Sequence, residues 1–385
     1  MSAREAASSA INASREAVLE LSHFVHAHPE MGYEEYLSAE AVAAAAERAG
    51  LLVERGIAGL PTAFRASAGS GDLHVVFCAE YDALPDVGHA CGHNIIAASS
   101  LGAAIGLAAV ADEVGVRVTL LGTPSEEGGG GKIDLINAGY FDDVHAAMMV
   151  HPWPVDRLEM TCLAVEQFDV TFHGKEAHAS AAPWDGVNAS DAMTISQVAI
   201  GLARQQLRPG DQVHGIVTDG GSAANIIPSR VVGRFMARSL TSQSLVALRQ
   251  KVTACFKAGA LATGASFETQ NLGSPFSHME SDYDLLAHYR SAAETLGRTF
   301  ELDDEGVPLP TASTDMGNVS LVVPSIHPLL GIETDGAVNH QPEFAAACIT
   351  ESADRAVIDG ATALAHAAIA VAQDEKLRAR LTARA

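Results

Sequence analysis

The chain has 385 residues, of which 48% are hydrophobic and 18% charged, so it has the length of two domains and the composition of a globular protein with a buried core. Its formal net charge of −23 argues against nucleic acid and anionic membrane as partners, and no segment has both the length and the flanks of a membrane span. Five scattered cysteines suggest no disulfide framework, so we expect a cytoplasmic protein.

The first part of the chain is expected to be helical. Residues 5–28 carry an apolar stripe at helical spacing that ends at Pro29, and an Ala-rich second helix extends to about residue 49. His26, His28 and Glu30 lie near the break between these helices. We interpret this region as a solvated helix end.

Three apolar segments have the pattern of buried strands. They cover residues 73–79, 116–122 and 146–150, and a helical segment at 93–113 lies between the first two. Strands that alternate with helices predict an α/β fold, whose mostly parallel sheet is covered by helices on both faces. Polar residues follow each strand directly, and in such sheets ligands bind beyond the carboxyl ends of the strands.

The segment 80–94, EYDALPDVGHACGHN, brings metal-binding side chains to the end of the first strand. Cys91 and His93 are two residues apart and would point the same way in an extended segment. A thiolate beside an imidazole suits zinc or a related divalent ion. The alternative for Cys91 is a buried structural thiol.

The other two strands also lead into polar residues. Glu126, Glu127 and four glycines come after the second strand, and His151 comes after the third. The glycines do not form a phosphate loop, because that motif needs glycine at position 126 and serine or threonine at position 133. We interpret them as residues that let the backbone pass close to a crowded site.

Five ligands from four segments could meet at these strand ends: Cys91, His93, Glu127, His151 and one late histidine. Five ligands, one of them bridging, suit two metal ions about 3.5–4 Å apart. Glu126 is then free to act as a base, and a metal-bound water with a lowered pKa is the nucleophile. The pattern predicts amide-bond hydrolysis without a covalent enzyme intermediate.

The pattern changes at about residue 165. Six elements are predicted in the order β-α-β-β-α-β: 165–172, 188–207, 213–218, 230–238, 244–262 and 266–270. This order is typical of a ferredoxin-like domain with an antiparallel sheet. We therefore expect an inserted α+β domain at 165–278 within a catalytic domain of residues 1–164 and 279–385. Helices at 283–296 and about 344–371 would complete the catalytic domain.

These stretches together resemble the M20 metallopeptidases, and within them the amidohydrolases of subfamily D. The nearest likeness is to aminobenzoyl-glutamate hydrolase subunits and M20 domain-containing dipeptidases. The resemblance covers nearly the whole chain, through segments 28–35, 80–94, 122–132, 151–152, 174–189, 225–228, 313–318 and 323–328. The segment 80–94 and the glutamate pair are its most specific parts.

The resemblance implies roles at the metal site. Cys91 would bridge two metal ions, where most of the wider family uses aspartate, and Glu126 would be the general base. The other ligands on this face would be His93, Glu127 and His151.

Four further positions are read from the same likeness. Asp82 would orient a ligand, and His340 matches the last metal ligand. His327 is a rival for that ligand, and we assign it to the substrate pocket. Glu80 stands where the wider family has a histidine ligand, so the metal geometry should differ from theirs.

The inserted domain is expected to act as a lid and to form a homodimer. His178 and Asn225 match residues that reach the site of the neighbouring subunit and steady the oxyanion. Arg238 matches an arginine that binds a substrate carboxylate in some relatives.

We predict a two-metal amidohydrolase that cleaves a small N-acyl amino acid, aminobenzoyl-glutamate or dipeptide. The thiolate favours zinc, with manganese as the alternative. Two rivals are a catalytically silent binding subunit of a heteromeric hydrolase and a hydrolase that uses Cys91 as its nucleophile.

Overall fold

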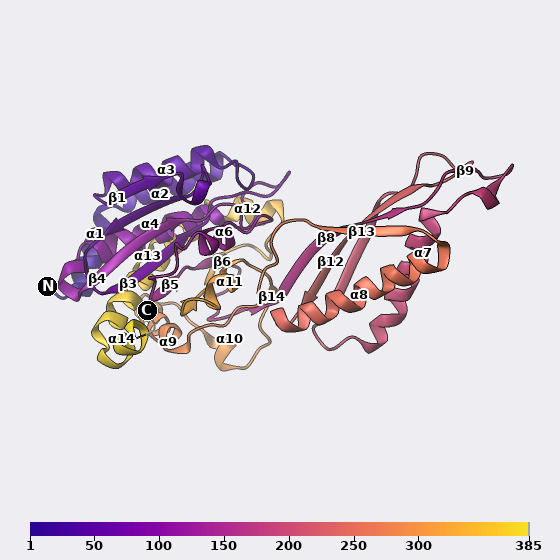
Figure 1. Ribbon diagram of the computed structural model, residues 1–385. Coiled ribbons are helices and arrows are strands. Elements are labelled where there is room, and N and C mark those ends of the chain that lie inside the picture. Colours follow the sequence, from indigo (N-terminus) through magenta and orange to yellow (C-terminus); the bar gives the residue numbers. More distant parts are fainter. Residues whose placement is uncertain (384–385) are drawn as a thin grey trace. The chain divides into compact units, whose positions relative to one another are not determined.

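The computed structural model describes residues 1–383, and its chain divides into two compact units (Figure 1). The first unit contains residues 1–161 and the segment from 279 onward, and the second contains residues 162–278. Each unit has a hydrophobic core of its own.

A six-stranded sheet forms the centre of the first unit, with the strand order β1-β2-β4-β3-β5-β15. The strands are β1 Leu52–Arg55, β2 Phe64–Ala68, β3 Leu73–Ala79, β4 Val116–Gly122, β5 Ala146–Met148 and β15 Ser325–Ile326. Strands β4, β3, β5 and β15 run parallel to one another, and β2 is antiparallel to both β1 and β4. The predicted mixed, mostly parallel sheet is confirmed. A separate parallel pair joins β6 His151–Trp153 to β16 Leu329–Gly331.

Helices cover both faces of this sheet. Successive side chains of each strand point to opposite faces, so one strand contributes to the core on each side. Val75 and Phe77 of β3 pack into the larger core cluster, whereas Val76 and Cys78 pack into the smaller one. The larger cluster is formed with α1 Ala3–Ala13, α2 Arg15–Ala27, α3 Tyr36–Arg48, α4 His93–Ala108, α9 Tyr283–Glu294, α13 Glu351–Gln373 and α14 Glu375–Thr382. The smaller cluster includes residues of α6 Gly131–Asn137 and α11 Met316–Ser320.

Helix α13 fills the middle of the larger cluster. Among the described residues it is the one helix that is long and apolar enough to cross a membrane by length and composition. Of its most apolar window, 83% is buried inside the protein, as in the core helix of a globular domain.

The second unit is a four-stranded antiparallel sheet with two helices, in the order β8-α7-β10-β12-α8-β13. Its main elements are β8 Ala164–His173, α7 Ala189–Ala203, β10 Gln212–Asp219, β12 Arg230–Ser239, α8 Ser242–Thr263 and β13 Ser266–Asn271. The spatial order β10-β12-β8-β13 is the ferredoxin-like arrangement predicted from the sequence. A small sheet of β9 Ala177–His178 and β11 Ile226–Ile227 lies outside it.

Several elements differ from the predicted ones, and the expected helix 93–113, for example, is divided into α4 and α5. The expected helix 5–28 is divided at Ser14 into α1 and α2, and the expected helix 344–371 is divided into α12 Pro342–Ala347 and α13. Strands β1 and β2 were not predicted. The remaining short elements are α5 Ala111–Val114, α10 Glu301–Asp304, β7 Thr161–Cys162, β14 Thr311–Ala312, η1 Ile57–Gly59, η2 Pro183–Asp185 and η3 Arg204–Gln206.

Candidate metal centre

The predicted metal-binding residues come together at one edge of the sheet in the first unit. The segment after β3 carries Cys91 and His93, the segment after β4 carries Glu127, and His151 opens β6 directly after β5. His340 arrives from the turn before α12, and its backbone N–H donates to the carbonyl oxygen of Ala90 at 2.9 Å.

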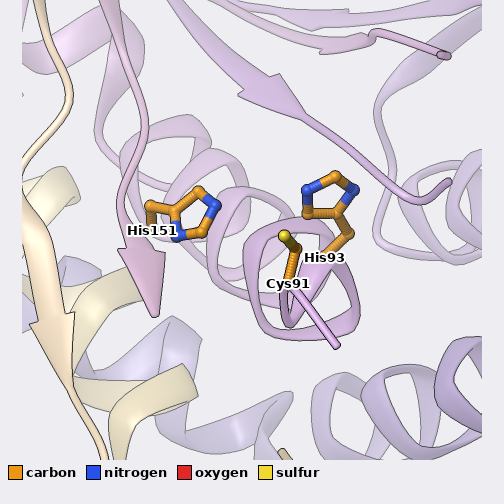
Figure 2. Close-up of side chains that lie close together, drawn as sticks. All are labelled: Cys91, His93 and His151. Atoms are coloured by element: carbon orange, nitrogen blue, oxygen red, sulfur yellow. The ribbon is translucent and has the colours of Figure 1, made fainter. Parts of the chain in front are cut away.

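These residues form two groups of three that share one thiol. The donor atoms of Cys91, His93 and His151 lie within 4.8 Å of one another. Figure 2 shows these three side chains close together. The donor atoms of Cys91, Glu127 and His340 meet the same limit. A shared thiolate between two groups is the arrangement expected of a bridging ligand between two ions.

Gly92 creates the turn that makes Cys91 and His93 converge. Its φ of 73° is left-handed, and His93 is the first residue of α4. A Cβ atom at this position would lie 2.4 Å from Cγ of Pro152, so only glycine fits. The two side chains therefore meet at a tight turn into a helix. The prediction that they meet along an extended segment was wrong.

Several donor atoms at the centre are buried and lack a hydrogen-bond partner among the described residues. They include Nε2 of His93 and Oε1 of Glu127, which are 3.8 Å apart. On the other side, Nε2 of His340 is 4.0 Å from Oε2 of Glu127. Unsatisfied buried polar atoms are costly, and bound divalent cations would satisfy Nε2 of His93 and Oε1 of Glu127. Thiolate, imidazole and carboxylate donors at this spacing fit zinc.

Asp82 contacts two of the segments that carry predicted ligands. Its Oδ1 lies 2.9 Å from Nδ1 of His93, and its Oδ2 accepts from the backbone N–H of Glu127 at 2.9 Å. This contact leaves Nε2 of the imidazole facing the centre, and the bond orients the ring.

Glu126 is the second carboxylate of the pair, and its carboxylate lies within 4.8 Å of the donor atoms of His93 and Glu127. Its Oε2 is 4.0 Å from Nε2 of His93, and the residue is buried. Burial raises the pKa of Glu126 well above its usual value, and the nearby carboxylates of Glu80 and Glu127 raise it further. An acid with a raised pKa is suited to accept and return a proton.

A buried ion triad, which the sequence analysis did not identify, supports the loop after β3. Nζ of Lys132 donates to Oε1 of Glu80 and to Oδ1 of Asp315, each at 2.6 Å, and none of the three side chains is exposed. Burial lowers the pKa of Lys132, but the two carboxylates outweigh burial and hold it above its usual value. The feature of the sequence that could have indicated this triad was the lysine directly after the glycine run.

His327 is close to the centre but outside both groups of three. It is buried, and its ring lies 5.4 Å from that of His151. Neither ring nitrogen has a hydrogen-bond partner among the described residues. Of the two rival late histidines, His340 is therefore the one whose donor atom joins a group of potential ligands.

The other predicted residues belong to the second unit. His178 on β9 is opposite Ile226 on β11, and the carbonyl oxygen of Asn225 accepts from the N–H of Ala179 at 3.0 Å, so these two exposed residues are neighbours. Arg238 is half-buried near the end of β12. Arg230 and Arg238 are about 26 Å apart along β12. Strand β11 precedes the first residue of β12, so Arg238 lies at the far end of β12 from β11.

Comparison with known proteins identifies the family. The pattern of peptidase family M20/M25/M40 matches residues 71–368. A mouse protein named Xaa-Arg dipeptidase is 40% identical over 324 residues, which are 81% of this chain and 75% of the relative. One of the subunits of the Escherichia coli p-aminobenzoyl-glutamate hydrolase is 31% identical over 280 residues, which are 67% of this chain and 58% of the relative.

Solved structures share the fold. A Bacillus subtilis protein described as a dinuclear metal-binding peptidase from the M20 family gives a TM-score of 0.72 at 20% identity, covering 94% of this chain and 99% of that one. A putative aminohydrolase from Staphylococcus aureus gives 0.77 at 19% identity, covering 95% and 99%. At this identity the likeness concerns the fold alone. The matched pattern and the mouse relative each span most of this sequence, and the chain therefore belongs to the M20/M25/M40 peptidase family, as its motifs predicted.

Proposed function

We propose that this protein hydrolyses the amide bond of a small N-acyl amino acid, aminobenzoyl-glutamate or dipeptide with two divalent metal ions. The observation that carries the proposal is the pair of donor groups that share Cys91. Dipeptides that end in arginine are the first substrates to test, because the mouse and human relatives are named Xaa-Arg dipeptidases.

The metal ions would be held by the two groups described above. Cys91, His93 and His151 would hold one ion, and Cys91, Glu127 and His340 the other. The thiolate favours zinc over manganese. When bound, the two ions would supply Lewis acidity, which polarises the scissile carbonyl and lowers the pKa of the attacking water.

Glu126 is proposed to move the proton. Its carboxylate accepts a proton from the water as the water oxygen bonds to the carbonyl carbon. The same proton then passes to the nitrogen of the leaving amine as the C–N bond breaks, so Glu126 returns to its starting form. Asp82 keeps the imidazole of His93 oriented throughout, through the 2.9 Å contact.

We further propose a homodimer in which His178 and Asn225 of one subunit serve the site of the other. Two neighbouring features of the second unit support a protein interface. Strand β10 is an edge strand with exposed Ile216, and Val198 and Leu202 are exposed on α7. An unpaired strand edge and exposed apolar residues favour association with a second copy.

The first experiment combines metal content with activity. Elemental mass spectrometry of protein purified without chelators should find about two divalent ions per chain. Glu126→Ala should keep both ions and lose nearly all turnover of an Xaa-Arg dipeptide, whereas Glu113→Ala, an exposed control, should keep full activity. Full activity in Glu126→Ala would remove Glu126 as the base.

Chelation separates the two rival functions from this proposal. A chelator should abolish turnover, and zinc should restore it. A hydrolase that uses Cys91 as its nucleophile would resist chelation. A silent binding protein would show no turnover with any amide substrate, even when two ions are bound.

A further inference from the structure

The loop between α2 and α3, residues 28–35, makes hydrogen bonds to the two loops of the candidate site, one after β3 and one after β4. The carbonyl oxygen of Glu30 accepts from the N–H of Ala83, next to Asp82, at 2.8 Å. Oε1 of Glu35 accepts from the N–H of Ser125, next to Glu126, at 2.7 Å. One short loop thus fixes the backbone beside both groups.

Ser125 has a backbone conformation that requires support. Its φ is 58°, in the left-handed region that non-glycine residues avoid. This turn directs the next residue, Glu126, toward Nε2 of His93, 4.0 Å away. A residue held in such a conformation keeps it only where the surroundings determine it.

Two glycines make room for the Ser125 side chain. A Cβ atom at Gly32 would lie 2.3 Å from Oγ of Ser125, and one at Gly129 would lie 2.2 Å from the same atom. Gly32 belongs to the loop 28–35, so that loop supplies both the hydrogen bond and the space. The loop is anchored further by Tyr33, whose hydroxyl donates to Asp134 of α6 at 2.7 Å.

Glu35 is costly to place in this position. The residue has no exposed surface, and its second oxygen, Oε2, has no hydrogen-bond partner among the described residues. Burying a carboxylate costs free energy, and the hydrogen bond from the N–H of Ser125 offsets part of that cost.

We infer that Glu35 is a positioning residue for the reaction, because it holds the left-handed turn at Ser125 that directs Glu126 to the metal centre. The inference rests on the proposed function of Glu126. Glu35 itself contacts neither substrate nor metal; it acts through the backbone of the neighbouring loop.

The test compares Glu35→Ala with Glu35→Gln, which keeps an acceptor oxygen for the Ser125 N–H. Misplacement of a catalytic group by about 1 Å costs on the order of 100-fold in rate. Glu35→Ala should therefore lower kcat about 10- to 100-fold, with KM and the content of two metal ions unchanged. Glu35→Gln should stay within about threefold of the wild type. Adding Ser125→Gly to Glu35→Ala should recover part of the loss, because glycine adopts φ 58° without strain.

Two further measurements keep the test decisive. Hydrogen exchange should be faster in Glu35→Ala for a peptide covering residues 123–130, and this readout does not depend on turnover. If Glu35→Ala does not fold, Gly32→Ala, which displaces Ser125 with Glu35 intact, should show the same loss of kcat with both ions retained.

The inference is overturned if Glu35→Ala keeps its kcat and exchange rate, if Glu35→Gln loses as much as Glu35→Ala, or if Gly32→Ala is fully active. A wild type that binds two ions but cleaves no amide contradicts the proposed function instead, and the exchange experiment then decides separately whether Glu35 holds the turn.

Discussion

Removing the Lys132 side chain should destabilise the first unit strongly. In Lys132→Met, Glu80 and Asp315 lose the ammonium that each contacts at 2.6 Å, and both carboxylates remain without exposed surface. Breaking a buried ion pair by removing one partner costs about 3–5 kcal/mol, because an uncompensated charge stays buried. That loss is a large share of a typical free energy of unfolding, about 5–15 kcal/mol.

Tryptophan fluorescence can report this loss from the first unit alone. The chain has two tryptophans, Trp153 in the first unit and Trp184 in the second. In a Trp184→Phe background, urea unfolding of metal-free protein followed by Trp153 gives the midpoint and slope for the unit that contains Lys132. Lys376→Met, on the surface of α14, is the matched control and should change the free energy of unfolding by less than about 0.5 kcal/mol.

Neutralising the carboxylates should reverse the effect. The triple variant Lys132→Met, Glu80→Gln, Asp315→Asn removes all three charges, so it should recover at least about 2 kcal/mol relative to Lys132→Met. The loss in Lys132→Met should also be smaller at pH 5 than at pH 8, because protons can replace the lysine. If the free energy of unfolding of Lys132→Met lies within about 1 kcal/mol of the wild-type value, the view that the triad stabilises the fold by charge compensation is refuted.

Three further outcomes are expected. Asp82→Ala should weaken metal affinity about 10- to 100-fold in competition with a chromophoric chelator, because the His93 ring loses its orienting contact; unchanged affinity would contradict this role. Burial, followed by Arg117, lowers the pKa of His74 to about 4 from 6.5, so the folded state disfavours the protonated ring and stability should fall as the pH drops from 6.5 to 4; His74→Asn should flatten that slope by up to about 1.4 kcal/mol per pH unit in urea titrations. Leu202→Lys should shift the sedimentation of a dimer toward the monomer, while Leu261→Lys, at a leucine of α8 that is also exposed to solvent, should not; a monomeric wild type would contradict the proposed interface.

The strength of the apolar pattern decided which parts of the fold could be predicted. Residues 73–79 and 116–122 are predominantly apolar stretches that end before polar residues, and the strands β3 and β4 have those same bounds. Strands β1 and β2 are short and contain Glu54, Arg55 and Arg65, so no burial pattern marked them. The break at Ser14 was not visible because the apolar stripe continues across it.

At the site, the residue types in the sequence indicated metal binding, but the backbone conformation could not be predicted from them. Cys91, His93, Glu127 and His151 are metal-binding types in an uncommon concentration, and the structure brings them together. Lys132 was overlooked because lysine is rarely buried, and its burial here depends on Glu80 and on Asp315, which is 183 residues away. His28 is exposed, as the interpretation of a solvated helix end requires, but His26 is half-buried, with its Nε2 2.8 Å from the carbonyl oxygen of Ala345. The same interpretation missed Glu35, because its burial arises from contact with the distant loop at Ser125.

The position of α13 after all the strands of the first unit has a consequence for biosynthesis. This helix contributes many residues to the larger core, yet residues 351–373 leave the ribosome after every strand of the sheet. The second unit, whose residues are contiguous and enclose their own core, can fold while translation continues. The sheet at whose edge the proposed metal ligands lie lacks one of its covering helices until α13 has been synthesised, so a nascent chain exposes apolar strands. A truncation before Glu351 would leave these strands uncovered.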